Sequence, residues 1–197
     1  MTIVSIRGTH GSGKSTIVRK ILDRYTDRPY NVNPKGKPDG YEVDLPNGDT
    51  LFVVGPYHTA CGGCDAIQPY ARILDLINYG AQTCDHVLLE GALVSSSYGT
   101  VGNLLNHYAT VQSTPAVFAF LDTTLETCLD RIKQRRAAKG NFEPLNPTNT
   151  AVKFDNVART KQQMAKLGSS VRIVDIDHRK PTQQVLRLFG VQIRKEL

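Results

Sequence analysis

A glycine-rich stretch near the start of the chain has the spacing most specific for chemistry. Residues 8–15 read GTHGSGKS and fit the pattern G-x-x-x-x-G-K-[ST] at every fixed position. In such a loop, backbone N–H groups cradle phosphate oxygens, and the lysine adds a mobile positive charge for the β- and γ-phosphates. The alternative is a glycine turn that precedes a helix by chance. By position, phosphate binding is predicted for Gly11, Ser12, Gly13, Lys14, Ser15 and Thr16.

A hydroxyl and a carboxylate are candidates for holding Mg²⁺ beside bound phosphates. Ser15 offers its hydroxyl at the last position of the motif. Glu90 ends the apolar run HVLLE, and the carboxyl end of a buried strand lies at the edge of the ligand crevice in open α/β sheets. Glu90 could hold the Mg²⁺ shell, act as a general base or bind local backbone, and these three roles stay open.

A second carboxylate, Asp65, follows an apolar run and a polar loop, at the expected start of a helix. A carboxylate there could accept the proton of a substrate hydroxyl, as kinase bases do. It could equally cap the helix. The sequence does not separate Asp65 from Glu90 as the base.

Basic residues gather in the last turns of a helix expected from Leu125 to about Ala138. Arg131 and Arg135 lie four residues apart and therefore share one helix face. They could close over a nucleotide, as part of a lid at about residues 131–150, and stabilise the moving phosphoryl group. A solvated helix end, whose cations complement the helix dipole, is the alternative.

The loop GPYHTACGGCD, residues 55–65, is the candidate substrate pocket, with Tyr57, Cys61 and Cys64 as predicted contacts. Tyr57 could stack on a base, although tyrosine is also common at half-buried positions. The Cys-x-x-Cys spacing admits zinc or redox chemistry, but a structural zinc site needs four ligands, and the other cysteines and histidines lack metal-like spacing. Arg72 could bind a substrate phosphate or be simply exposed.

Composition narrows the class of protein. The chain has 197 residues, of which 40% are hydrophobic, which suits a single domain with a real core. No apolar run approaches the ~18 residues of a membrane span. Scattered cysteines favour the reducing cytoplasm. The net charge of +6 favours an extended polyanion as partner. A homodimer remains open.

Strands alternate with helices through most of the chain, which predicts an α/β fold with a mainly parallel sheet. Asn47-Gly48 between two strand-like runs predicts a hairpin, with residues 41–45 at the edge of the sheet and 50–54 inside it. Residues 27–40 are expected to form a loop. Further strands are expected at 3–6, 86–90, 116–121 and 171–176, and further helices at 66–79, 104–111, 153–167 and from Pro181 to near Phe189.

The nucleotide-binding motif alone does not separate a switch, a motor and a kinase. A small GTPase would usually show an Asn-Lys-x-Asp motif, which this chain lacks, and an ATPase motor would usually be larger. Small size, a basic helix end and a following loop favour a phosphotransferase. A non-enzymatic NTP-binding switch or assembly ATPase is the alternative from another class.

The stretch GTHGSGKST, the strand-ending LLEG at 88–91 and Leu121-Asp122 before an Arg-rich helix resemble the nucleotide and polynucleotide kinase branch of P-loop proteins. The resemblance implies a P-loop NTPase three-layer sandwich with five parallel strands, the P-loop strand in the centre, an extra hairpin strand and an Arg-rich lid. Carried over by position, Arg131 and Arg135 are lid arginines, and Asp65 resembles the base of phage polynucleotide kinase.

The combination of GPYHTACGGCD with LLEGALVS looks like phage-encoded kinases that phosphorylate 5-hydroxymethyluracil within DNA, a step in DNA hypermodification. The resemblance implies ATP and Mg²⁺ as cofactors, DNA containing a modified pyrimidine as partner, and the host cytoplasm as location. The Asp-Arg-[Tyr/His] and Glu-Arg-Ser motifs of thymidylate and deoxynucleoside kinases are missing. The alternative is a kinase of a free nucleoside, nucleotide or other small molecule.

Overall fold

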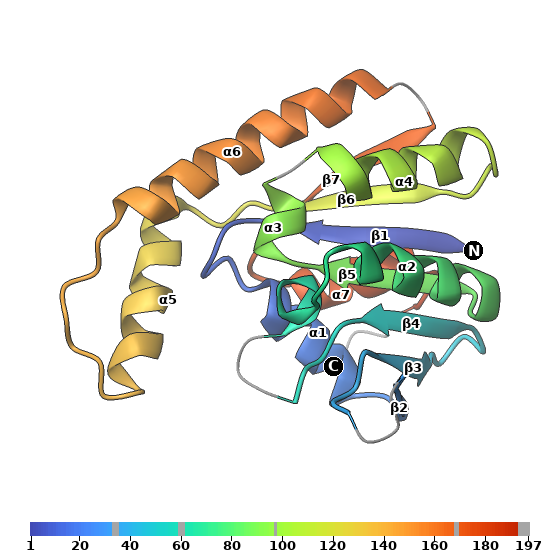
Figure 1. Cartoon of the computed structure of the whole chain (residues 1–197), viewed down its shortest axis with the longest axis horizontal. Helices are drawn as coiled ribbons and strands as arrows, with labels where there is room; N and C mark the ends of the chain where they lie inside the picture. The colour runs from blue at the N-terminus through green and yellow to red at the C-terminus, as the bar shows by residue number, and fades with distance from the viewer. Residues whose placement is uncertain (33–35, 59–61, 97, 168–169, 193–197) are drawn as a thin grey trace.

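The protein is built on one mostly parallel sheet. The computed structural model describes residues 1–32, 36–58, 62–96, 98–167 and 170–192. Within these residues seven strands are ordered β2-β3-β4-β5-β1-β6-β7 (Figure 1). The strands are β1 (Thr2–Arg7), β2 (Asp27–Tyr30), β3 (Gly40–Asp44), β4 (Thr50–Val54), β5 (His86–Glu90), β6 (Ala116–Leu121) and β7 (Val171–Ile176).

Strands β4, β5, β1, β6 and β7 run parallel to one another, with β1 in their middle, whereas β3 runs antiparallel to both β2 and β4. The predicted α/β class, the mainly parallel sheet and the hairpin of β3 with β4 are therefore confirmed. This arrangement places the glycine loop, which follows β1, between the loops that leave β5 and β6.

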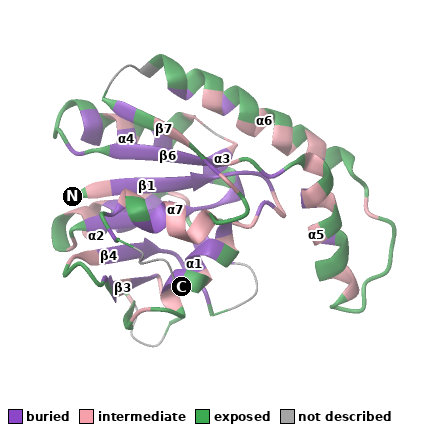
Figure 2. Cartoon of the chain, turned by 180° about the vertical axis from the view of Figure 1, so that it is seen from behind, coloured by how far each residue is buried: buried purple, intermediate pink, exposed green. Residues whose placement is uncertain are grey.

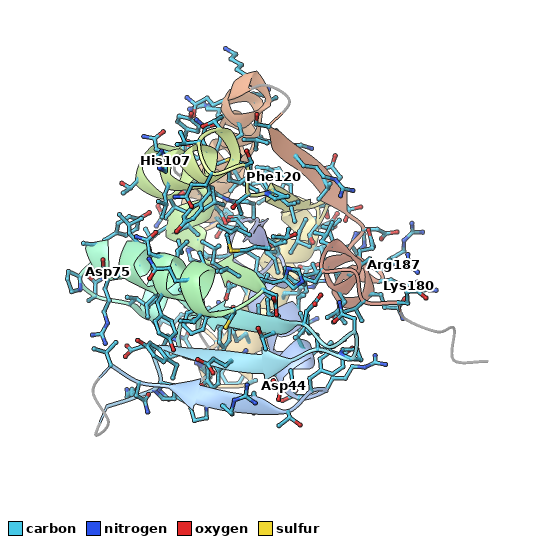
Figure 3. All side chains as sticks on the ribbon, turned by 90° about the vertical axis from the view of Figure 1, so that its right-hand side faces the viewer. Asp44, Asp75, His107, Phe120, Lys180 and Arg187 are labelled. Carbon is cyan, nitrogen blue, oxygen red and sulfur yellow. The ribbon has the colours of Figure 1, made fainter. Side chains whose placement is uncertain are left out.

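Helices cover both faces of the sheet. They are α1 (Lys14–Leu22), α2 (Ala71–Thr83), α3 (Ala92–Ser95), α4 (Gly99–Thr110), α5 (Leu125–Ala137), α6 (Thr148–Met164) and α7 (Pro181–Leu188), with 3-10 turns at Gly63–Ala66 (η1) and Ala165–Leu167 (η2). Asp75 of α2 and His107 of α4 lie on one side of the sheet, and Lys180, just before α7, and Arg187, in α7, lie on the other (Figure 3). None of the described helices is long and apolar enough to cross a membrane.

The sheet separates two apolar cores, and its central strands are buried on both faces (Figure 2). Along β5, Val87 and Leu89 join the core beneath α2 and α4, while Leu88 joins the core beneath α1 and α7. Strands buried on both faces read as continuous apolar runs, which is why the sequence pattern located β1, β4, β5 and β6.

Two expectations about the sheet edge were wrong. Residues 27–40 were expected to form a loop, but Asp27–Tyr30 pairs with β3 as a further antiparallel strand, so β2 and not β3 is the edge. Pro29 has no N–H for a sheet ladder, and such a residue is tolerated in an edge strand. The polar, proline-containing DRPY therefore gives no strand signal in the sequence.

The predicted helix boundaries also shift. The helix expected at 66–79 is α2, which begins at Ala71, because the residue before a proline avoids helical geometry and Pro69 lies in this segment. Asp65 consequently lies in η1 and not at the start of α2. Helix α4 begins at Gly99, before the expected 104, since buried Val101 and Leu105 outweigh the low helix propensity of its glycines. Helix α6 spans 148–164, where 153–167 was expected.

The carboxyl ends of the five parallel strands lie at one edge of the sheet, on the left in Figure 1. The glycine loop, η1, α3 and α5 all follow strands at this edge. Helix α5 and the segment that leads to α6 project away from the body of the molecule (Figure 1). The fold thus gathers the predicted chemical residues at one end.

Phe52 in β4 tests the core beneath α2. Its side chain is fully buried, and its ring lies 5.2 Å from that of Tyr79. We expect Phe52→Ala to lower the free energy of unfolding by about 3–5 kcal/mol, since it leaves a cavity in a packed core. Urea unfolding measures this. Phe142→Ala, at a side chain that is 80% exposed, is the matched control. Equal effects of the two substitutions would contradict the packing described.

Candidate active site at the carboxyl edge of the sheet

The glycine loop, residues 8–15, turns tightly between β1 and α1. Gly11 and Gly13 have φ angles of 78° and 103°, in the left-handed region that side-chain-bearing residues rarely adopt. A Cβ on Gly11 would lie 2.4 Å from the carbonyl oxygen of Cys128, so the loop also packs directly on α5. Glycine is therefore required both for the backbone path and for the contact with the helix that carries the predicted lid arginines.

Lys14 is a positive charge held inside this loop. Its side chain is buried, and its Nζ donates to the carbonyl oxygens of Gly8 at 2.8 Å and Thr9 at 3.0 Å. Burial lowers the pKa of the Lys14 ammonium, and the negative charges of Glu90 and Asp65 oppose that change. The ammonium thus lies close to both predicted carboxylates.

Glu90 forms a buried polar cluster with two hydroxyls. The carboxylate ends β5 and is 1% exposed. Its Oε1 accepts hydrogen bonds from the hydroxyls of Ser15 at 2.8 Å and Tyr57 at 3.2 Å. Burial raises the pKa of Glu90, whereas Lys14 and the two hydrogen bonds counter this shift. The structure therefore brings together the two residues predicted for Mg²⁺ and adds Tyr57, whose hydroxyl faces a carboxylate.

Asp65 caps a helix, but a different helix from the one expected. Its Oδ2 accepts from the backbone N–H of Ala92 at 2.7 Å, and its Oδ1 accepts from that of Leu93 at 2.9 Å. These are the first N–H groups of α3, which follows β5. A Cβ on Gly91 would lie 3.0 Å from Oδ1 of Asp65, so glycine permits this close approach. The exposed Asp65 carboxylate is thereby fixed beside the strand end that carries Glu90.

The predicted lid arginines lie on α5, against the glycine loop. Thr124 accepts a hydrogen bond from the N–H of Thr127 and so caps this helix. The guanidinium of Arg131 donates to the carbonyl oxygens of Gly11 at 3.4 Å and Ser12 at 3.1 Å. Arg135 is exposed, and its charge is close enough to lower the pKa of Lys14. The basic end of α5 therefore faces the loop.

Two of the residues predicted to contact substrate, Tyr57 and Cys64, are buried. Cys61 falls outside the described residues. Cys64 is buried, and burial raises the pKa of its thiol. Tyr57 is also buried, so its hydroxyl supports Glu90 in this structure. Their contact with substrate stays a prediction.

Arg72 lies beside a cavity at the carboxyl edge of the sheet. Its guanidinium pairs with the carboxylate of Asp39 at 2.6 Å. Both side chains line a cavity of about 340 Å³ near the carboxyl end of β4, together with Gln68, Pro56 and Ile67. A volume of this order is typical of small-ligand sites.

Several residues at the site carried no signal in the sequence. Arg7 is fully buried, and its guanidinium donates to the hydroxyl of Ser5 and to the carbonyl oxygen of Val94. The hydroxyl of Ser95 accepts from the N–H of Gly8 at 3.2 Å. On the lid side, the Nζ of Lys153 lies 2.8 Å from Nε2 of His10. Apart from the contact of Arg7 with Ser5, each of these contacts joins segments far apart in the sequence, so no local motif predicts it.

Most of the sequence is similar to a group of known enzymes. A "5-hmdU DNA kinase" of Pseudomonas phage PaMx11 is 35% identical over 180 residues, which are 89% of this chain and 91% of that protein. A "5-hmdU DNA kinase" of Pseudomonas phage M6 is 30% identical over 87% of this chain and 90% of the relative. One of Delftia phage PhiW-14 is 28% identical over 84% of this chain and 65% of the relative. No protein-family model matches the chain.

These relatives are all named as kinases, so the chain is a phosphotransferase. The identity and the nearly complete coverage on both sides show the family as well. The chain belongs to the family of phage 5-hmdU DNA kinases.

Tyr57→Phe tests the buried cluster around Glu90. The substitution removes a hydrogen bond that stabilises the ionised carboxylate, so the already raised pKa of Glu90 rises further. We expect the acid limb of the activity profile to move to higher pH, because the carboxylate is then lost at a higher pH as the solution is acidified. The pH dependence of turnover measures this.

Tyr41→Phe is the matched control for that substitution. The Tyr41 hydroxyl accepts from the backbone N–H of Tyr57 at 3.2 Å and makes no described contact with Glu90. Its acid limb should coincide with that of the unmodified protein. An unmoved limb in Tyr57→Phe would mean that Glu90 does not set the acid side of the profile.

Proposed function

We propose that this protein is a P-loop kinase that transfers the γ-phosphoryl group of ATP to the 5-hydroxymethyl group of 5-hydroxymethyluracil in DNA. The observation that carries the proposal is the buried Lys14 ammonium, held inside a glycine loop next to the Glu90–Ser15 pair. Family membership and the names of the relatives support the class of acceptor. The net charge of +6 agrees with a polyanionic substrate.

The glycine loop is suited to the triphosphate. Residues 11–16 supply backbone N–H groups at the start of α1, where anions are favoured. The hydroxyls of Thr9 and Ser12 are buried and have no hydrogen-bond partner among the described residues. Buried polar groups without partners in native proteins often point to a ligand or solvent. We assign the β- and γ-phosphates to this loop, with Lys14 exchanging its carbonyl contacts for phosphate oxygens.

The donor set beside the loop fits Mg²⁺. Ser15 and Glu90 offer hard oxygen ligands, and their oxygen atoms already lie 2.8 Å apart. A bound Mg²⁺ would neutralise negative charge on the phosphates. Ser15 and Glu90 would hold the ion, and Tyr57 would keep the Glu90 carboxylate oriented and ionised.

The carboxylates of Glu90 and Asp65 are proposed to have different roles. Glu90 is 1% exposed and already accepts hydrogen bonds from two hydroxyl groups, which suits a residue that would hold Mg²⁺. Asp65 is exposed and has its orientation fixed by two backbone N–H groups, while each carboxylate oxygen keeps a further lone pair. We therefore assign to Asp65 the role of accepting the proton of the substrate hydroxyl.

Arg131 and Arg135 are proposed to stabilise the charge of the moving phosphoryl group. Arg131 already reaches the loop, where it donates to the carbonyl oxygens of Gly11 and Ser12. Both arginines belong to a proposed lid of about residues 131–150 within a single domain, and α5 with the segment that leads to α6 projects away from the body of the molecule (Figure 1).

The acceptor base is proposed to enter from the side of β4, between η1 and the cavity lined by Arg72. A base stacked in a duplex has to be flipped out before it can react, at a cost of a few kcal/mol. Arg72 would contact the polar groups of the flipped nucleotide, and the loop at 57–64, which includes Tyr57, Cys61 and Cys64, would shape the pocket. The ion pair of Arg72 with Asp39 fixes the direction of the guanidinium.

Transfer of labelled γ-phosphate from ATP tests the proposed function. With Mg²⁺, we expect label to enter duplex DNA containing 5-hydroxymethyluracil and not matched thymine DNA, free nucleosides or free nucleotides. Lys14→Ala should lower this transfer by about 10²–10³-fold or more, because a positive charge on the transferring group is lost.

The alternative outcomes of this experiment are distinct. Label that enters only a small molecule would replace DNA as the acceptor and keep the nucleotide site. Label that enters no acceptor, or substantial turnover by Lys14→Ala, would overturn the assignment of the glycine loop. Moderate salt should inhibit transfer to DNA, since phosphate contacts release counterions, while transfer to a small acceptor should be far less sensitive.

Asp65→Asn tests the proposed base. We expect turnover to fall by about 10²–10⁴-fold with little change in KM for DNA, because the proton acceptor is lost. Steady-state kinetics and the midpoint of thermal unfolding should be measured together. A loss confined to stability or to substrate affinity would make Asp65 a structural cap of α3 only.

A further inference from the structure

A lysine of α6 is in contact with a histidine of the glycine loop. The Nζ of Lys153, in the first turns of α6, lies 2.8 Å from Nε2 of His10, in the middle of the loop. Both side chains are half-buried. Helix α6 follows the projecting segment after α5 (Figure 1). The contact therefore joins the helix that follows the lid to the glycine loop.

The chemistry of this contact fixes the state of the imidazole. A lysine ammonium has only donors, so Nε2 of His10 must be the acceptor and the ring must be neutral with its proton on Nδ1. Burial lowers the pKa of His10, and the nearby charges of Lys153, Lys14 and Arg135 lower it further, while Asp65 alone among the named groups raises it. His10 is therefore an uncharged partner for Lys153.

The cations at the glycine loop use uncharged acceptors, whereas several cations elsewhere in the described residues pair with carboxylates. Lys14 and Arg131 donate to backbone carbonyl oxygens of the loop, and Lys153 donates to an imidazole of the same loop. By contrast, Lys161, farther along α6, pairs with the carboxylate of Asp175. Carboxylates likewise hold Arg28, Arg72 and Arg179.

A neutral acceptor leaves a cation ready to bind an anion. Exchanging a carbonyl oxygen or imidazole nitrogen for a phosphate oxygen replaces a neutral hydrogen bond with a stronger charge-assisted one. Several like charges around one loop also repel one another unless an anion lies between them. Lys153 shares both properties with Lys14 and Arg131, which the proposed function already assigns to phosphate.

We propose that Lys153, in the helix that follows the lid, is a ligand of the terminal phosphate of the bound nucleoside triphosphate, and that His10 is the positioning residue that holds its ammonium at the loop. This inference rests on the proposed nucleotide site and adds to Lys14, Arg131 and Arg135 a further cation, from α6. It also gives a role to the side chain at a variable position of the glycine motif.

The test compares a triphosphate with a diphosphate. Calorimetric titration with ADP and with a non-hydrolysable ATP analogue, both with Mg²⁺, gives the affinity of each nucleotide. We expect Lys153→Met to weaken binding of the triphosphate analogue by about tenfold, the loss for one charge-assisted hydrogen bond, and to leave ADP within about twofold. Lys153→Arg should retain most of the preference for the triphosphate.

Lys161→Met is the matched control, because it removes the same charge from the same helix at a site paired with Asp175. Its affinities for both nucleotides should match those of the unmodified protein. Equal weakening of ADP and the triphosphate analogue in Lys153→Met, or no weakening of either, would overturn the inference. Failure of the unmodified protein to bind either nucleotide would instead overturn the proposed function.

His10 is tested by rescue. His10→Ala should lower the preference for the triphosphate in the same direction as Lys153→Met, since the ammonium loses its acceptor. His10→Gln, whose amide oxygen can accept from Lys153, should recover most of that preference. An unchanged ratio of the two affinities in His10→Ala, or no recovery in His10→Gln, would contradict the positioning role of His10.

Discussion

The buried ammonium of Lys14 is the constraint on which the rest of the site depends. Removing a charge from water is costly unless hydrogen bonds and opposite charges replace the solvent. Two loop carbonyl oxygens accept from Nζ, and the carboxylates of Glu90 and Asp65 lie close enough to oppose the fall in its pKa. Burial simultaneously raises the pKa of Glu90. Both charged groups are thus held at a cost to the free protein, which is the usual condition of a preorganised site.

The short helix α3 connects this charged centre to the body of the fold. The guanidinium of Arg7, at the end of β1, donates to the carbonyl oxygen of Val94, and burial lowers its pKa to about 10. The N–H of Gly8 donates to the hydroxyl of Ser95, and Asp65 accepts from the first N–H groups of α3. A helix of one turn has little stability of its own. Here it is held from three sides, so that the strand end, the glycine loop and Asp65 keep fixed relative positions.

Local patterns predicted the parts of this structure that depend on local physics. The glycine motif and the apolar runs of the central strands could both be recognised, because the turn geometry and the burial of a strand depend on a few consecutive residues. Strand β2 was missed because a polar edge strand with Pro29 has no apolar alternation. Asp65 was considered as a cap of the helix that follows it in sequence. It instead accepts from the first N–H groups of α3, which lies 27 residues further along the chain.

The partners of Tyr57 and His10 were beyond local patterns for the same reason. Tyr57 meets Glu90 across 33 residues, and His10 meets Lys153 across 143. Side chains whose contacts are set by topology can be assigned a chemistry from the sequence but not a partner. Candidate side chains could therefore be named from the sequence, whereas the order of the strands determines which of these side chains are in contact.

The type of acceptor beside each cation explains how the site can be both preassembled and ready to bind. If a carboxylate held Arg131 or Lys153, an incoming phosphate would have to displace it and then face its negative charge. Carbonyl oxygens and the neutral His10 ring instead fix these cations without opposing the phosphate. The positive field of the loop is thereby preserved for an anionic ligand. Arg72, which is proposed to contact the acceptor, is instead paired with the carboxylate of Asp39, and this pair fixes the orientation of its guanidinium.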